Sequence, residues 1–147
     1  MTISTTSTLR QHHQHCDELF SLMEKDVSDH NWIVGLKSFE SFLQEMEDHF
    51  HCEEETLFPA FEAATGMAQG PTQVMRVEHA QMRNLMQQLR EASTVQDEDA
   101  FIGAAETLLI LMQQHNMKEE NILYPMCDQH VSIDIGQQIR SAIPGKA

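Results

Sequence analysis

The segment His49-Phe-His-Cys-Glu-Glu-Glu-Thr-Leu-Phe-Pro59 returns later in the chain as His115-Asn-Met-Lys-Glu-Glu-Asn-Ile-Leu-Tyr-Pro125. The two copies share a histidine, two glutamates, a leucine, an aromatic ring and a proline, each shifted by the same 66 positions (49→115). A histidine and a glutamate four residues apart lie on one face of an α-helix. Each copy is therefore predicted to be a helical segment that presents an imidazole and a carboxylate together.

Sparse glycine and proline predict an all-α protein around these segments. The chain has only 6 glycines and 4 prolines among 147 residues, and good helix formers fill the long runs between them. We expect helices over about residues 7–25, 36–64, 71–92 and 97–124, and residues 133–143 are a candidate for a short fifth helix. Short connections between four helices favour an up-down-up-down four-helix bundle.

The length suits a single domain over residues 1–147, with residues 1–8 as a flexible tail and residues 131–147 as a C-terminal extension. Apolar residues at helical spacing are expected to form the core. In the first three helices these are Leu19, Leu22 and Met23; Phe39, Leu43, Met46, Phe50 and Leu57; and Met75, Met82, Met86 and Leu89.

Composition excludes several classes of function. Lys and Arg number 9 against 23 Asp and Glu, giving a net charge of −14, so nucleic acid is a poor partner. Apolar runs are too short to span a bilayer, and the N-terminus has no secretory signal, so we expect a cytoplasmic protein that does not bind membranes. Cys16, Cys52 and Cys127 are then expected to be free thiols, with Cys52 an inert residue near the inward face.

Two further histidines, His15 and His79, lie about two turns into the first and third helices, 64 positions apart (15→79). In an up-down bundle this is the level of both His-x-x-x-Glu segments. Six polar groups in one apolar layer are costly to bury unless cations compensate them. The sequence therefore predicts a metal centre made by His15, His49, Glu53, His79, His115 and Glu119.

Four imidazoles and two carboxylates suit two ions bridged by the carboxylates, and iron or manganese fits them better than structural zinc. Glu54 and Glu120 remain alternatives to Glu53 and Glu119 as bridging ligands. His12 is a candidate for the layer behind the ligands, and His13, His30, His51 and His130 are expected at the surface. Met82 and Met86 are interpreted as core, and Phe58 and Tyr124 as packing over the end of the site.

These motifs resemble the hemerythrin-like (HHE cation-binding) domain family over about residues 9–130, and in particular its non-carrier bacterial branch. The resemblance implies a four-helix bundle that holds an oxo- or hydroxo-bridged non-haem di-iron centre, with manganese or zinc as substitutes. It also implies terminal histidine ligands and bridging Glu53 and Glu119. In the variant that the chain looks most like, His15 pairs with His115 on one iron, and His49 pairs with His79 on the other.

The chain departs from the oxygen carriers of that family. Carriers have His-x-x-x-His in the third helix, whereas Arg83 stands four residues after His79 here, and Glu119 and Glu120 replace a lone Asp at the fifth position after His115. Simple oxygen transport is therefore disfavoured. Counting donors leaves about one of roughly six positions open at each iron.

Three hypotheses follow for the function. The first is a protein that binds or senses a small diatomic ligand, O2 or NO. The second is an enzyme that, with an unidentified redox partner protein, reduces NO or peroxide or donates iron for iron-sulfur cluster repair. The third is a bundle whose polar layer holds other metals or is only structural. A ferritin-like di-iron site is disfavoured because no histidine has a glutamate three residues before it.

Overall fold

The structure, a computed structural model, describes residues 4–143, and its regular elements in that range are all helical. The prediction of an all-α protein is confirmed. The first half of the chain contains α1 (Ser7–Ser28), α2 (Trp32–Cys52), the π-helical turn η1 (Glu53–Leu57) and α3 (Phe58–Thr65). The second half contains α4 (Pro71–Thr94), α5 (Glu98–Lys118), the π-helical turn η2 (Glu119–Leu123), α6 (Tyr124–His130) and α7 (Ile133–Ala142).

The 66-residue repeat extends well beyond the quoted motif, because α5 and η2 begin and end 66 positions after α2 and η1 (32→98, 53→119). The helix starts are built alike. Asn31 accepts a hydrogen bond from the backbone N–H of Val34, and Asp97 accepts one from that of Ala100. The residues just before them, His30 and Gln96, both have positive φ, 62° and 53°. The same turn therefore reverses the chain twice.

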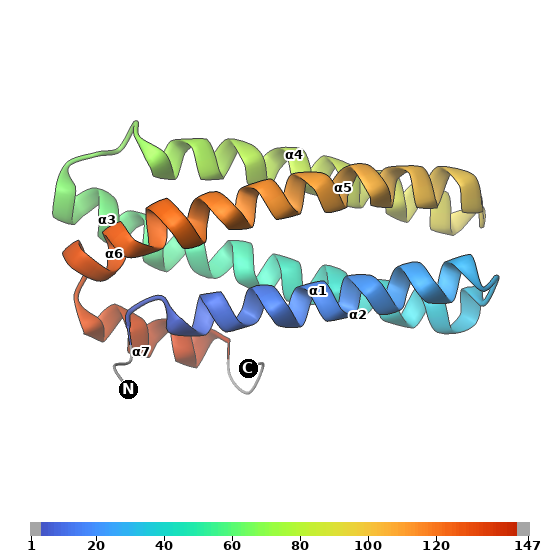
Figure 1. Cartoon of the computed structure of the whole chain (residues 1–147), viewed down its shortest axis with the longest axis horizontal. Helices are drawn as coiled ribbons and strands as arrows, with labels where there is room; N and C mark the ends of the chain where they lie inside the picture. The colour runs from blue at the N-terminus through green and yellow to red at the C-terminus, as the bar shows by residue number, and fades with distance from the viewer. Residues whose placement is uncertain (1–3, 144–147) are drawn as a thin grey trace.

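Four long helices, α1, α2, α4 and α5, lie along the long axis of the molecule (Figure 1). The turns that join α1 to α2 and α4 to α5 lie at one end, and the short helices α3, α6 and α7 lie at the other (Figure 1). Gly66, with φ of 73°, ends α3 in the left-handed conformation that glycine adopts without strain. Among the described residues, no helix combines the length and apolarity that a bilayer crossing requires.

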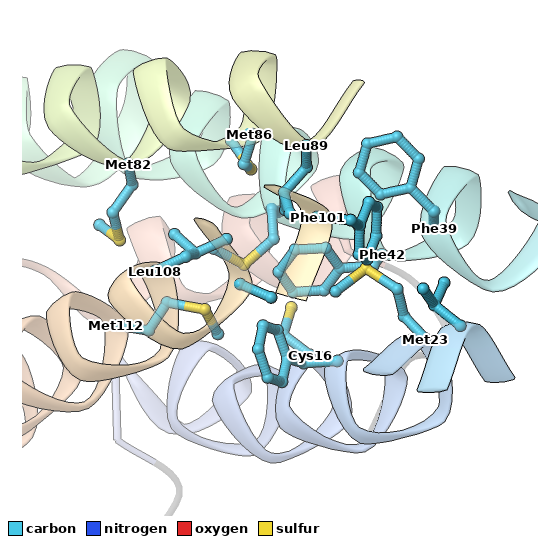
Figure 2. Close-up of a cluster of buried hydrophobic side chains, with 14 of the residues drawn as sticks. Cys16, Met23, Phe39, Phe42, Met82, Met86, Leu89, Phe101, Leu108 and Met112 are labelled. Carbon is cyan, nitrogen blue, oxygen red and sulfur yellow. The ribbon is translucent and has the colours of Figure 1, made fainter. Parts of the chain in front are cut away.

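Two apolar clusters fill the interior. The middle cluster gathers side chains from all four long helices (Figure 2). Its buried members include Cys16, Phe20, Met23, Phe39, Phe42, Met46, Phe50, Met82, Met86, Leu89, Phe101, Leu108 and Met112. The end cluster lies among the short helices and includes Leu9, Cys52, Leu57, Phe58, Phe61, Met75, Leu123, Tyr124, Cys127, Ile139 and Ile143. The interpretation of Met82 and Met86 as core is confirmed.

The inward face of α1 differs from the predicted one. Leu22 is 53% exposed and Leu19 is only partly buried, whereas Phe20, which is not among the predicted core residues, is buried. The observed stripe on α1 is Leu9, His12, His13, Cys16, Phe20, Met23 and Val27. The helix is turned by about one residue, or roughly 100°, from the orientation that we predicted.

The chain ends are better packed than expected within the described range. The start of the predicted tail is anchored, because the backbone N–H and the hydroxyl of Thr6 both donate to Asp128, at 3.1 and 3.0 Å. The C-terminal extension contains α7, whose Ile139 is buried in the end cluster. The rest of these two predicted segments, residues 1–3 and 144–147, lies outside the described residues.

The middle cluster gives a direct test of the packing. Phe42 is fully buried there, so Phe42→Ala should lower the free energy of unfolding by about 3–5 kcal/mol through lost burial and a cavity. Ile110→Ala is the matched control, because Ile110 is 58% exposed and its loss should change stability by less than about 0.5 kcal/mol. Urea unfolding followed by circular dichroism measures both, and equal losses would contradict the described core.

Candidate metal centre

A layer of polar side chains separates the two apolar clusters. On each long helix the polar residue falls where one cluster gives way to the other: His13 on α1, His49 on α2, His79 on α4 and His115 on α5. All four histidines are buried, as are the carboxylates Glu53 and Glu119 in the two π-helical turns. Unpaired ions in such surroundings cost several kcal/mol each, so these groups must compensate one another.

One set of ligand-type atoms comes from Glu53, His79, His115 and Glu119, here called the His79 group. One donor atom from each of the four residues lies within 4.8 Å of all the others. Nε2 of His79 lies 3.0 Å from Oε1 of Glu53, and Nε2 of His115 lies 3.3 Å from Oε1 of Glu119. Two carboxylate oxygens and two imidazole nitrogens therefore surround one small volume.

A second set, the His13 group, consists of His13, His49 and Glu119. Nε2 of His13 lies 3.0 Å from Oε1 of Glu119. The imidazole rings of His13 and His49 lie 4.7 Å apart between centroids. Glu119 belongs to both groups. Glu53 also faces both, because its Oε2 lies 3.5 Å from Nε2 of His49 while its Oε1 faces His79.

Unsatisfied atoms show that these residues fit a metal ion. Five buried side-chain nitrogen or oxygen atoms in the described part of the chain have no hydrogen-bond partner, and four are in the His79 group: Glu53 Oε1, His79 Nε2, His115 Nε2 and Glu119 Oε2. The His79 and Glu53 atoms are close but lack hydrogen-bond geometry. Buried polar atoms are almost always hydrogen-bonded, so four neighbouring atoms without a hydrogen-bond partner indicate a site for a cation.

Protons balance the charges of the metal-free chain. Burial alone would lower the pKa of His13, but its hydrogen bonds to Glu119 and Glu120 outweigh burial and raise that pKa to about 10. Burial likewise opposes protonation of His79, and Glu53 and Glu54 overcome it to raise its pKa to about 9. Protons on the imidazoles therefore offset the negative charge of the buried carboxylates, and cations bound there would replace these protons.

Each of the four histidines is also held from behind through its Nδ1 atom. His13 contacts Glu120 at 2.6 Å, His79 contacts Glu54 at 2.7 Å, and His115 contacts Glu78 at 2.8 Å. Such bonds fix the ring so that Nε2 faces the centre. These bonds also give neighbouring glutamates different places. Glu53 and Glu119 lie in the two groups of ligand-type atoms, whereas Glu54 and Glu120 bond to the outer nitrogens of the histidines.

The fourth histidine, His49, is held by another histidine. Nδ1 of His49 lies 2.8 Å from Nδ1 of His12, and Nε2 of His12 lies 2.7 Å from Glu45. Burial, followed by repulsion from His49, lowers the pKa of His12 to about 4, so His12 is neutral at pH 7. This contact agrees with the predicted place of His12 behind the ligands.

The π-helical turns bring Tyr124 into the site. The backbone N–H of Phe58 bonds to the carbonyl of Glu53, and that of Tyr124 bonds to Glu119, each five residues back. Pro59 and Pro125 follow directly, and a wider turn relieves the clash of a proline ring with the carbonyl four residues earlier. The hydroxyl of Tyr124 then donates to Glu53 at 2.6 Å, so Tyr124 does more than cover the end of the site.

Comparison with protein-family models supplies the deciding observation: residues 4–127 match the hemerythrin HHE cation-binding domain. The chain belongs to the hemerythrin family. Comparisons with curated proteins and with solved structures found no match. The predicted resemblance is confirmed for the family, and the buried histidine and glutamate groups support a metal-binding hemerythrin-like protein.

In this hemerythrin-family chain the structure gathers five of the six predicted site residues and leaves the sixth, His15, outside the two groups. His49, Glu53, His79, His115 and Glu119 lie in the two groups. His15 is only partly buried and belongs to neither group, because α1 turns a different face inward. His13, which we expected at the surface, occupies that place.

The repeat contained the signal that distinguishes His13 from His15. His13 to His79 is a shift of 66 positions, as for His49 to His115, whereas His15 to His79 is 64. The implied pairing also changes, because the structure groups His13 with His49 and His79 with His115. It does not place His15 with His115 or His49 with His79.

Other predicted roles can be placed in the same way. His30, His51 and His130 are exposed, as expected. Cys52 is buried, and burial raises the pKa of its thiol to about 12, which keeps it protonated and unreactive at neutral pH. Arg83 supplies no donor to either group, because its guanidinium bonds to Glu54 at 2.8 Å and to Glu47 at 3.0 Å.

The raised histidine pKa values predict how the metal-free chain responds to pH. His13 and His79 bind more protons in the folded state between pH 6.5 and about 9–10, so stability should fall as pH rises through that window. His12 binds fewer protons when folded, so stability should rise from about pH 4 to 6.5. Urea unfolding of the metal-free protein should therefore give a maximum near pH 6.5, and a steady rise to pH 9 would contradict this charge balance.

Proposed function

We propose that this hemerythrin-family chain is an up-down-up-down four-helix bundle that binds a pair of iron ions and takes up a small diatomic ligand, O2 or NO. The observation that carries the proposal is the convergence of buried, unpartnered imidazole and carboxylate atoms at one level of the bundle. The proposed terminal ligands are His13, His49, His79 and His115, and the proposed bridges are Glu53 and Glu119. A bound iron pair would supply one-electron redox chemistry and open positions for a ligand.

Two ions are favoured over one by the way the carboxylates are shared. Glu119 belongs to both ligand groups, and the two oxygens of Glu53 face histidines of different groups. A single ion would leave part of this donor set buried and uncompensated. Imidazole and carboxylate donors without thiolate suit iron, and manganese and zinc are the substitutes that loading experiments should compare.

The surroundings favour uptake of a small uncharged ligand. The aromatic rings of Phe50 and Phe58 stack on His79, with centroids 4.0 and 5.7 Å away, so the walls beside the His79 group are apolar. Arg83 stands where the oxygen carriers have another histidine, and it bonds to carboxylates on the outside. One position at the metal beside His79 is then left for an external ligand.

An enzyme is the second candidate, and the place of Tyr124 favours it. A buried phenol within hydrogen-bond distance of Glu53 and Glu119 places a reactive side chain beside the proposed metal pair. Such a group would assist reduction of NO or peroxide by a redox partner, and release of iron for cluster repair belongs to the same proposal.

Metal loading distinguishes the ligand set proposed from the structure, with His13, from the one expected from the sequence, with His15. Metal-free protein loaded anaerobically with Fe(II) and desalted should retain about two irons per chain by elemental analysis. His13→Ala should lower that number because a ligand is lost, whereas the neighbouring His15→Ala should leave it unchanged. Loss of iron in His15→Ala with retention in His13→Ala would contradict the ligand set.

Exposure to gases distinguishes the two candidate functions. The iron-loaded, reduced protein should change its visible spectrum on addition of O2 or NO and recover when the gas is removed, since binding alone consumes nothing. Sustained consumption of NO or peroxide with a chemical reductant would instead favour the enzyme. Apo protein serves as the control, and an iron-loaded protein that responds to neither gas would contradict diatomic binding.

A further inference from the structure

The hydroxyl of Tyr124 lies at the centre of the polar layer, and the inference drawn from it rests on the metal pair proposed above. The side chain is fully buried. Its oxygen lies 2.6 Å from Oε2 of Glu53 and 3.1 Å from Oε1 of Glu119. It also lies 3.3 Å from Nε2 of His13 and 3.3 Å from Nε2 of His49. Four proposed ligand atoms therefore surround one phenol oxygen.

Hydrogen bonding accounts for only part of this cluster. The phenol has one hydrogen, which it donates to Glu53, and its oxygen can accept a hydrogen bond from His13, so its proton does not account for the contact with Glu119. Donor atoms that bind one ion at about 2.1 Å and at right angles to each other lie about 3 Å apart. The spacing of the Tyr124 oxygen from His13, His49 and Glu119 matches that of ligands that share an ion.

The internal repeat shows that packing does not require this hydroxyl. Phe58 is the equivalent residue 66 positions earlier, in the same setting. Tyr124 stacks on His13 at 5.6 Å between centroids, as Phe58 stacks on His79 at 5.7 Å. Arginine guanidinium groups lie 5.4 Å from each ring centroid. The two positions differ by one oxygen, and a buried oxygen costs free energy unless it has a partner.

We propose that the phenol oxygen of Tyr124 is a ligand of the metal ion at the His13 group, and that this makes the two metal positions unequal. The ion beside His79 and His115 lacks a phenol and is the one that meets an external ligand. Coordination releases the phenol proton to solvent, as it does for other protic ligands. The added negative charge stabilises ferric relative to ferrous iron at that position, once an oxidant such as O2 has removed the electron.

The experiment uses the fact that Tyr124 is the single tyrosine of the chain. The wild-type protein, loaded with iron and oxidised, should show an intense visible phenolate-to-iron charge-transfer band with resonance-enhanced tyrosine ring vibrations. Tyr124→Phe should retain about two irons per chain but lose both signals. A ferric wild-type protein without the band, or a band that persists in Tyr124→Phe, would overturn the proposal and leave the hydroxyl as a hydrogen-bond donor only.

A matched swap tests the inequality of the two positions. The double variant Phe58→Tyr/Tyr124→Phe moves the phenol to the equivalent place beside His79, so the band should return, whereas NO binding to the reduced protein should weaken relative to Tyr124→Phe. A band that does not return while iron is retained would contradict the proposed equivalence. Iron counts keep the proposals separate: a wild-type protein that binds no iron refutes the metal centre, and one that binds iron without a phenolate signal refutes only the role of Tyr124.

Discussion

The structure depends on the cost of placing two carboxylates and four imidazoles in a layer between two apolar clusters. Nothing in that layer is stable alone, because an isolated buried ion costs several kcal/mol even after relaxation. In the metal-free chain, protonated His13 and His79 offset Glu53 and Glu119. Glutamates orient the rings of His13, His79 and His115, and His12 orients that of His49. The contacts that link the long helices therefore also gather the donor atoms that could hold a cation.

Helix content and most of the site could be predicted from the sequence, since the repeated His-x-x-x-Glu segments combine a helical period with a donor set. The inward face of α1 could not be predicted. His12, His13 and His15 lie within one turn, and the apolar residues after them, Leu19, Phe20 and Leu22, support more than one orientation. Packing against the other helices decides it, by burying Phe20 and exposing Leu22. The apolar pattern of the first helix therefore fits two orientations about equally well, and only the 66-residue spacing of the repeat distinguishes them.

The π-helical turns were also invisible to periodicity, which treats each helix as uniform. Their effect is local but large: Tyr124, five positions after Glu119, points to the same side as that carboxylate. Proline supplies the chemical reason for the wide turn, and the aromatic ring just before the proline packs against the histidines of the site. The sequence signal, a Pro after Leu-Phe or Leu-Tyr in both copies, was present without an obvious structural meaning.

The two halves are alike in backbone but not in every side chain that touches the centre, with His12 opposite Glu78 and Phe58 opposite Tyr124. Two separate copies of one hairpin, assembled as a symmetric dimer, would carry every substitution twice. Covalent linkage of the halves removes that restriction. A single polypeptide can therefore change one side of a shared site without changing the other, a freedom closed to a strictly symmetric design.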